Sequence, residues 1–168
     1  MAATAASWKR EPFGDGVPLP FAATYSAAQF ARIAEGLVPE QMEDKWFIFH
    51  ESPYLFLHRS WTGLPVYRLT LAPRGDGVVV VEALWSSTFA KDDPAAREYE
   101  ARLLDFLVAA LLLRQPTPFP RPSGVGEPAP GVIQHHVAGT ALPEVAAGAN
   151  GGSPRAGASA KKPWWRFW

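Results

Sequence analysis

The 168-residue sequence contains no cysteine. This absence excludes disulfide bonds, zinc sites with thiolate ligands, iron–sulfur clusters and a cysteine nucleophile. It is compatible with a reducing compartment, where disulfide bonds are rare, but does not by itself establish one.

A long apolar run and an excess of basic charge are missing as well. The longest apolar stretch, residues 103–113, contains Asp105 and is too short to span a bilayer. Residues 1–16 have no apolar signal core and reach a charge at Lys9. The 16 Lys and Arg residues are balanced by 16 Asp and Glu residues, which leaves no nucleic-acid footprint. We expect a soluble cytoplasmic protein without a nucleic-acid partner.

Motifs of the common enzyme classes are also absent. The sequence has no G-x-S-x-G, no P-loop, no H-E-x-x-H and no G-x-G-x-x-G pattern. His50 stands alone near a strand end, and the neighbouring His135 and His136 would point to opposite sides of an extended chain. We therefore expect no metal and no cofactor, and we favour a binding protein over an enzyme.

What is present predicts a helix at each end of a strand-rich region. In residues 25–37, Ser26 and Gln29 fit a capping box, and Gly36 suits the position just past a helix end. A second, longer helix is expected over residues 92–114, with Pro94 in its first turn. Its leucines recur on one face, which is typical of a helix that packs on a core.

Four short runs rich in β-branched and aromatic residues lie between the helices, at 45–51, 54–61, 65–72 and 77–85. Their connections are short enough to allow only antiparallel neighbours. The order predicts an α+β domain over residues 21–114. It would consist of a helix, a four-stranded antiparallel meander and a long C-terminal helix, with both helices on one face of the sheet.

The two ends of the chain have a different composition. Residues 1–20 are expected to form an extended lead-in. After Arg114 the sequence holds more than half of its 17 prolines and 14 glycines, so residues 115–162 are predicted to be a disordered linker. The chain then ends in a separate aromatic segment, residues 163–168.

The central strands carry more ionisable residues than a plain hydrophobic sheet needs. Glu82 interrupts an apolar run, and strict alternation puts it on the same face as Val80, so a buried carboxylate there would need a cationic partner. Arg59 is the first candidate, with Lys45 and Arg68 as the alternatives.

These residues define a candidate ligand site on the helix-free face of the sheet. Its members combine positive charge with aromatic surface, which suits a nucleotide, a phosphate-bearing metabolite or an acidic peptide. They are Lys45, Trp46, His58, Arg59, Trp61, Tyr67 and Arg68. A purely structural explanation competes with this one. Polar residues also line the solvent-exposed face of a sheet, where aromatic rings pack against the aliphatic parts of Arg and Lys side chains.

A second hypothesis makes the chain a small hydrolase of nucleotide-like or phosphorylated substrates. His58 would act as the general base, oriented by Glu82 or Glu43. No nucleophile and no oxyanion donors are marked by spacing, so the residues support this hypothesis less well.

The segments Glu-Asp-Lys-Trp-Phe-Ile (43–48) and His-Arg-Ser-Trp-Thr-Gly (58–63) together resemble a family of small, uncharacterised bacterial proteins. Members share this hairpin and a Leu-rich C-terminal helix, and the resemblance covers roughly residues 19–114. No activity of that family is known to us, so the resemblance implies no catalytic residue.

The final segment concentrates aromatic side chains after a basic pair, Lys161 and Lys162. Trp and Arg are favoured anchors of protein interfaces, and Trp is also enriched at membrane surfaces. We expect a motif for a protein partner, with folding back onto the domain and weak membrane contact as the alternatives. Its residues are Trp164, Trp165, Arg166, Phe167 and Trp168. The leading hypothesis is thus a small binding or adaptor module.

Overall fold

A computed structural model of the chain describes residues 1–121. The predictions for most of the linker and for the aromatic segment at residues 163–168 lie outside the described residues. Within the described part, no helix has the length and apolar character needed to cross a membrane.

The described residues form six strands, two α-helices and one π-helical segment. These are β1 (Gly16–Pro18), β2 (Thr24–Tyr25), α1 (Ala27–Glu35), β3 (Trp46–Glu51), β4 (Tyr54–Arg59), β5 (Pro65–Arg74), β6 (Gly77–Ser86), α2 (Pro94–Leu107) and η1 (Val108–Leu112). The prediction of an α+β chain with an antiparallel sheet is confirmed.

The sheet has six strands rather than the predicted four. Its order is β1-β6-β5-β4-β3, and β2 pairs with another part of β6. β1 lies in the region expected to be an extended lead-in, and Gly16–Pro18 pair with Leu84–Ser86. Both added strands are only two or three residues long, and prolines interrupt this region, so no alternating pattern could develop there.

Both helices begin where the sequence predicts a cap. The Ser26 hydroxyl accepts a hydrogen bond from the Gln29 N–H, and the Gln29 side chain accepts one from the Ser26 N–H. The Asp93 carboxylate accepts a hydrogen bond from the Ala95 N–H at the start of α2. The α-helical part of the second helix ends at Leu107 and continues as η1, so it is shorter than the expected helix over 92–114.

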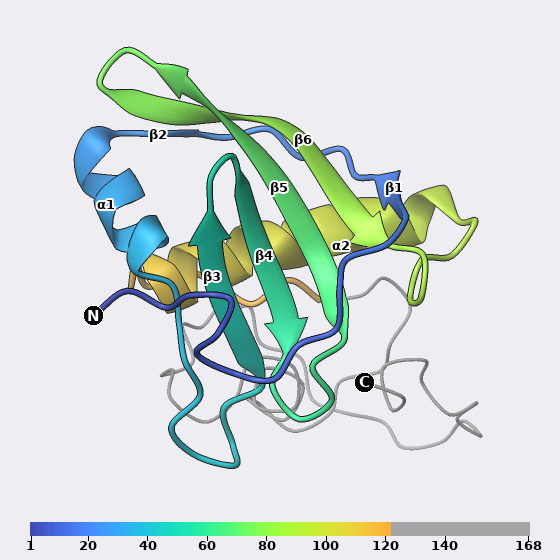
Figure 1. The fold of residues 1–168 in the computed structure, drawn as a ribbon. Helices are drawn as coiled ribbons and strands as arrows, with labels where there is room; N and C mark the ends of the chain where they lie inside the picture. The colour runs from blue at the N-terminus through green and yellow to red at the C-terminus, as the bar shows by residue number, and fades with distance from the viewer. Residues whose placement is uncertain (122–168) are drawn as a thin grey trace, which may run out of the picture.

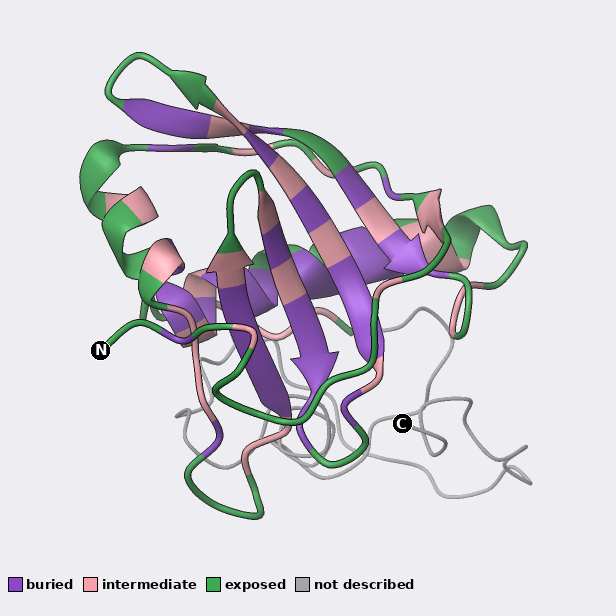
Figure 2. Ribbon diagram, in the orientation of Figure 1, coloured by how far each residue is buried: buried purple, intermediate pink, exposed green. Residues whose placement is uncertain are grey.

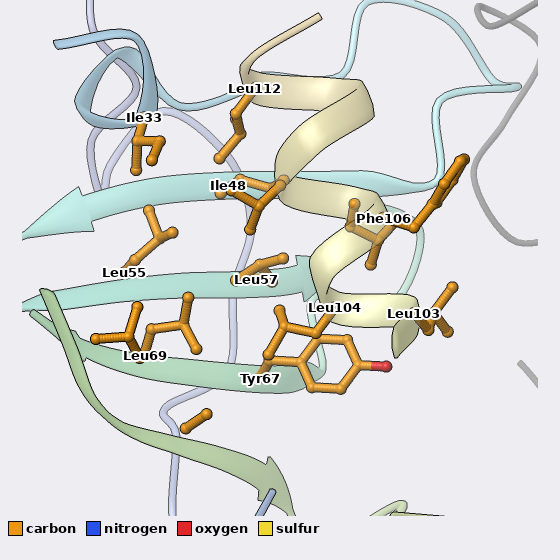
Figure 3. Packing of buried hydrophobic residues seen from close by; sticks show 14 of the residues in the cluster. Ile33, Ile48, Leu55, Leu57, Tyr67, Leu69, Leu103, Leu104, Phe106 and Leu112 are labelled. Carbon is orange, nitrogen blue, oxygen red and sulfur yellow. The ribbon is translucent and has the colours of Figure 1, made fainter. Parts of the chain in front are cut away.

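The hydrophobic core lies between the sheet and the helices, on what we call the helix face. Figure 1 shows α2 crossing behind the strands, with α1 at one side. In Figure 3, Leu104 of α2 points toward the strands that carry Leu57 and Tyr67, while Ile33 of α1 lies near Ile48. All five side chains are completely buried.

The opposite face of the sheet is not open, because the N-terminal strap, residues 3–13, crosses it. The Ala3 N–H donates to Glu35 O, and the Ala3 side chain packs against Phe47 and Phe49. Farther along the strap, the Glu11 N–H donates to Gly63 O at 2.8 Å. Figure 1 shows this segment running in front of β3 and β4. We call this side of the sheet the strap face.

A β-bulge in β6 changes which residues share a face. Thr70 pairs with Glu82 and Leu71 pairs with Val80, so Val81 is an extra residue on β6. The bulge shifts the alternation by one position, which moves Glu82 to the strap face. Strict alternation along the sequence put it on the same face as Val80, which the structure places in the core.

Replacing Leu104 by Ala should lower the free energy of unfolding by about 3 kcal/mol, because it removes a fully buried side chain and leaves a cavity. Glu98→Ala, on the exposed side of the same helix, is the control and should change stability by less than about 0.5 kcal/mol. Urea unfolding of both variants measures the difference. Equal losses would contradict the assigned packing of α2.

Candidate functional site

The structure divides the predicted ligand-site residues among three places. Trp46, Arg59 and Tyr67 lie together on the helix face. His58 and Arg68 lie on the strap face. Lys45 contacts Trp61 beyond the lower end of the strands. The expected single site on a helix-free face is therefore not formed.

The helix-face group is a buried cluster of Trp46, Arg59, Tyr67, Trp85 and Glu100. The Arg59 guanidinium lies over the Trp46 ring at 4.9 Å, and the Trp46 and Tyr67 rings stack with centroids 6.0 Å apart. From α2, Glu100 reaches the Tyr67 hydroxyl, which donates a hydrogen bond to the carboxyl Oε2. Four neighbouring strands and one helix thus meet at these side chains.

Burial perturbs the acid–base properties of this cluster. It raises the pKa of Glu100 to about 7, against the opposing effects of the Tyr67 hydroxyl, Lys91 and Arg59. Burial also lowers the pKa of Arg59 to about 10, although Tyr67 and Glu100 favour its charged form. At neutral pH the arginine is therefore charged, and the Glu100 carboxyl titrates far above the range of an exposed glutamate. Because the Glu100 carboxyl is completely buried, its ionisation changes the free energy of unfolding.

Sequence reasoning missed Glu100, although a signal was present. It precedes Leu103 and Leu104 by three and four residues, so it falls within the apolar stripe of the helix. A carboxyl group at such a position has to be buried, and it then needs a donor such as the Tyr67 hydroxyl.

Glu82 finds a partner on the other face. Its Oε2 accepts a hydrogen bond from the Thr70 hydroxyl at 3.2 Å and lies 3.6 Å from the Arg68 guanidinium. The expected pair of Arg59 and Glu82 is therefore wrong, because the bulge at Val81 separates the two side chains onto opposite faces. The alternative partner, Arg68, is confirmed, and the Glu82 side chain stays half exposed.

His58 is buried beneath the strap, among the rings of Phe47, Phe49 and Phe56. Its Nδ1 lies 2.9 Å from Gly63 O, and its Nε2 is buried without a hydrogen-bond partner. Burial lowers the pKa of His58, with a further contribution from the nearby Arg10.

The pairing of His58 with Glu82 that the hydrolase hypothesis expects is not formed, and the alternative partner, Glu43, is exposed in the loop before β3, whereas His58 is buried. Among residues 1–121, the hydrogen bond of His58 goes to a backbone carbonyl, whereas Glu82 contacts Thr70 and Arg68. In the same range, no group of three or more His, Asp or Glu side chains is placed to hold a metal ion.

Two exposed tryptophans and an exposed methionine lie close together, beyond the end of β4. Three segments meet there: the strap, the loop before β3 and the turn between β4 and β5 (Figure 2). Trp8 is 38% exposed, Met42 73% and Trp61 56%. These three residues, which we call the tryptophan surface, border a cleft of about 430 Å³.

Hydrogen bonds hold both exposed indoles in place. The Trp8 Nε1–H donates to Ser60 O at 2.7 Å, and the Trp61 Nε1–H donates to Met42 O at 2.8 Å. Ser60 itself is buried and donates through its hydroxyl to Asp44 O at 2.5 Å. The surface is therefore preorganised, which reduces the entropy that ordering side chains on binding would cost.

Charged residues of both signs surround the tryptophan surface. Lys9 and Glu40 line the cleft, and the Lys45 Nζ lies 4.4 Å from the centre of the Trp61 ring. The Asp44 carboxylate accepts hydrogen bonds from the Glu40 and Gln41 N–H groups, which shapes the loop. The motif residues Asp44, Lys45, Ser60 and Trp61 thus build one local structure.

A larger cleft of about 820 Å³ lies along α2, beside residues 20–22 and 117–120. Its wall includes the last residues before the described part of the chain ends, so we base no site on it.

Comparisons of the chain with protein-family models, with curated proteins and with solved structures gave no match. The family resemblance of the hairpin therefore stays a prediction, and function has to be inferred from the geometry above.

Glu100→Gln should reduce the dependence of stability on pH. The raised pKa means that stability from Glu100 is complete below its ordinary pKa of 4.5 and is lost as the pH rises through about 7. The loss amounts to roughly 3 kcal/mol. Urea unfolding should therefore show that the free energy of unfolding falls less between pH 5 and pH 8 in the variant than in the native chain. The same pH dependence in both would contradict the assignment.

Gly63→Ala should destabilise the chain more than Gly75→Ala. Both glycines have positive φ, 75° and 61°, so an L-residue at either position costs about 1–2 kcal/mol. A Cβ at Gly63 would also lie 3.1 Å from the Arg10 Cα, whereas nothing lies within 4 Å of one at Gly75. Urea unfolding should show an extra loss of about 1 kcal/mol for Gly63→Ala. Equal losses in the free energy of unfolding would show that the strap does not pack against this turn.

Proposed function

We propose that this chain is a binding module that captures an apolar peptide segment of a protein partner on the tryptophan surface. The observation that carries the proposal is the pair of exposed indoles, Trp8 and Trp61, which are each fixed by a hydrogen bond to a backbone carbonyl. These hydrogen bonds keep two large apolar side chains together at the surface, and exposed apolar patches of this kind often mark interaction sites. Trp is also the residue type most enriched among interface hot spots.

The charges around the surface favour a protein over other partners. Lys9 and Lys45 are offset by Glu40 and Glu43 in the same region. Binding to an anionic membrane or to a nucleic acid would need an excess of basic residues. An apolar centre with a polar rim of both signs is the usual composition of a protein interface.

This proposal keeps part of the ligand site predicted from the sequence and moves its position. Trp61 belongs to the tryptophan surface and Lys45 contacts it, whereas Trp46, Arg59 and Tyr67 lie in the buried cluster on the helix face. The aromatic segment at residues 163–168 stays a proposed second attachment point for a protein partner, which would make the chain an adaptor.

Selection of a random twelve-residue peptide library on the full chain at pH 7.5 tests the function. We expect enrichment of peptides with large apolar side chains. Trp61→Ala should weaken their binding about thirtyfold, the equivalent of about 2 kcal/mol for an interface tryptophan.

Val81→Ser is the matched control, because Val81 is as exposed as Trp61 but lies on the β6 bulge. It should leave binding unchanged. The proposal fails if no peptide is enriched, or if the enriched peptides bind Trp61→Ala as tightly as the native chain.

A further inference from the structure

The strap contributes one of the two exposed tryptophans, and it also crosses the face of the sheet that carries His58 (Figure 1). Trp8 belongs to the strap and is held by its hydrogen bond to Ser60 O. His58 lies two residues before Ser60 on β4, and it is only 1% exposed. The state of His58 and the position of Trp8 therefore depend on the same piece of chain.

The surroundings of His58 suit a neutral imidazole and oppose a charged one. Phe47 and Phe49 of β3 and Phe56 of β4 surround the ring, with centroid distances between 5.6 and 6.3 Å. The turn after β4 supplies only the carbonyl of Gly63, at Nδ1. The Nε2 atom is buried without a partner, so a second proton there would have no acceptor.

The charged groups on the strap face do not help to stabilise a cation at this position. The strap itself brings Arg10, whose guanidinium lies 5.6 Å from the centre of the Phe49 ring and repels a charged His58. From β5, Arg68 adds a second positive group, held between the rings of Phe13 and Tyr54. The Glu82 carboxylate on β6 is paired with Arg68, and Glu51 lies at the exposed end of β3.

We propose that His58 is a proton-operated latch, whose protonation releases the strap from the sheet and takes Trp8 out of the tryptophan surface. Undocking exposes Nε2 to water and removes Arg10 from its neighbourhood, so the proton binds more tightly to the undocked state. By linkage, a proton that prefers the undocked state must weaken docking. The regulatory meaning of the latch rests on the function proposed for the surface, but release of the strap does not.

The direction of the effect follows from the lowered pKa of His58 in the docked state. Docking is complete above the ordinary histidine pKa of 6.5 and weakens as the pH falls below it. The docking equilibrium should change by up to about tenfold for each pH unit between 6.5 and the lowered value. Binding at the tryptophan surface would therefore be strong at neutral pH and weak in an acidic environment.

The test follows the indole N–H of Trp8 in the full chain labelled with ¹⁵N-tryptophan, with Trp8→Phe to assign the signal. We expect its hydrogen-exchange protection, corrected for the intrinsic rate, to fall by up to about tenfold between pH 7.5 and pH 5.5. The signals of the buried Trp46 and Trp85 should persist, which shows that the sheet and α2 stay folded.

Two variants identify the group that titrates. His58→Gln stays neutral and can still donate to Gly63 O, so the protection of Trp8 should no longer depend on pH. His50→Gln is the matched control and should behave like the native chain, because His50 also has a lowered pKa but packs against Phe30 of α1. If His58→Gln unfolds, Arg10→Gln replaces it and should make the pH dependence shallower.

Three results would overturn the latch. These are a Trp8 signal that stays protected down to pH 5.5, an unchanged pH dependence in His58→Gln or in its substitute Arg10→Gln, and a simultaneous loss of the Trp8, Trp46 and Trp85 signals. None of them affects the peptide selection at pH 7.5, so the two proposals fail separately.

Discussion

The hydrogen bonds of Ser60 are the constraint on which the lower end of the molecule depends. Its carbonyl accepts the Trp8 indole N–H, its hydroxyl donates to Asp44 O, and its N–H donates to Lys45 O. One small buried residue thus joins the strap, the loop before β3 and the turn after β4. A side chain without a hydroxyl would remove the donor to the part-buried Asp44 carbonyl and loosen the loop before β3, whereas the two hydrogen bonds of the Ser60 backbone would remain.

Consecutive residues at the end of β4 serve different parts of the structure because a strand alternates its faces. Arg59 points into the core and balances Glu100 and Tyr67, whereas His58 points to the strap face. Trp61 follows in the turn, where its ring lies beside Lys45. The density of ionisable and aromatic residues in this hairpin therefore has no single explanation. It reflects a buried charge cluster, a covered histidine and an exposed surface built side by side.

The sequence predicted the parts of the fold that leave a periodic or local signal. The cap at Ser26 and the alternation in β4 are of this kind. The strap could not be predicted, because it packs through isolated contacts of Ala3, Trp8 and Arg10 rather than through a repeat. The face of the sheet on which Glu82 lies depends on a bulge in β6. This bulge exists only in the pairing with β5, so the sequence of β6 alone does not reveal it.

The arrangement of the sheet edges limits how this chain can be recognised. β1 and β2 cover successive parts of the outer side of β6, and Leu37 exchanges two hydrogen bonds with Ile48 on the outer side of β3. A bare edge invites strand addition, both by peptide ligands and by other copies during aggregation. These pairings occupy the outer side of β6 and the Ile48 position of β3, so less backbone is open to β-augmentation there. Short edge strands and a bridged central position leave only a limited template for strand addition, which lowers the tendency of the sheet to pair edge to edge with another copy.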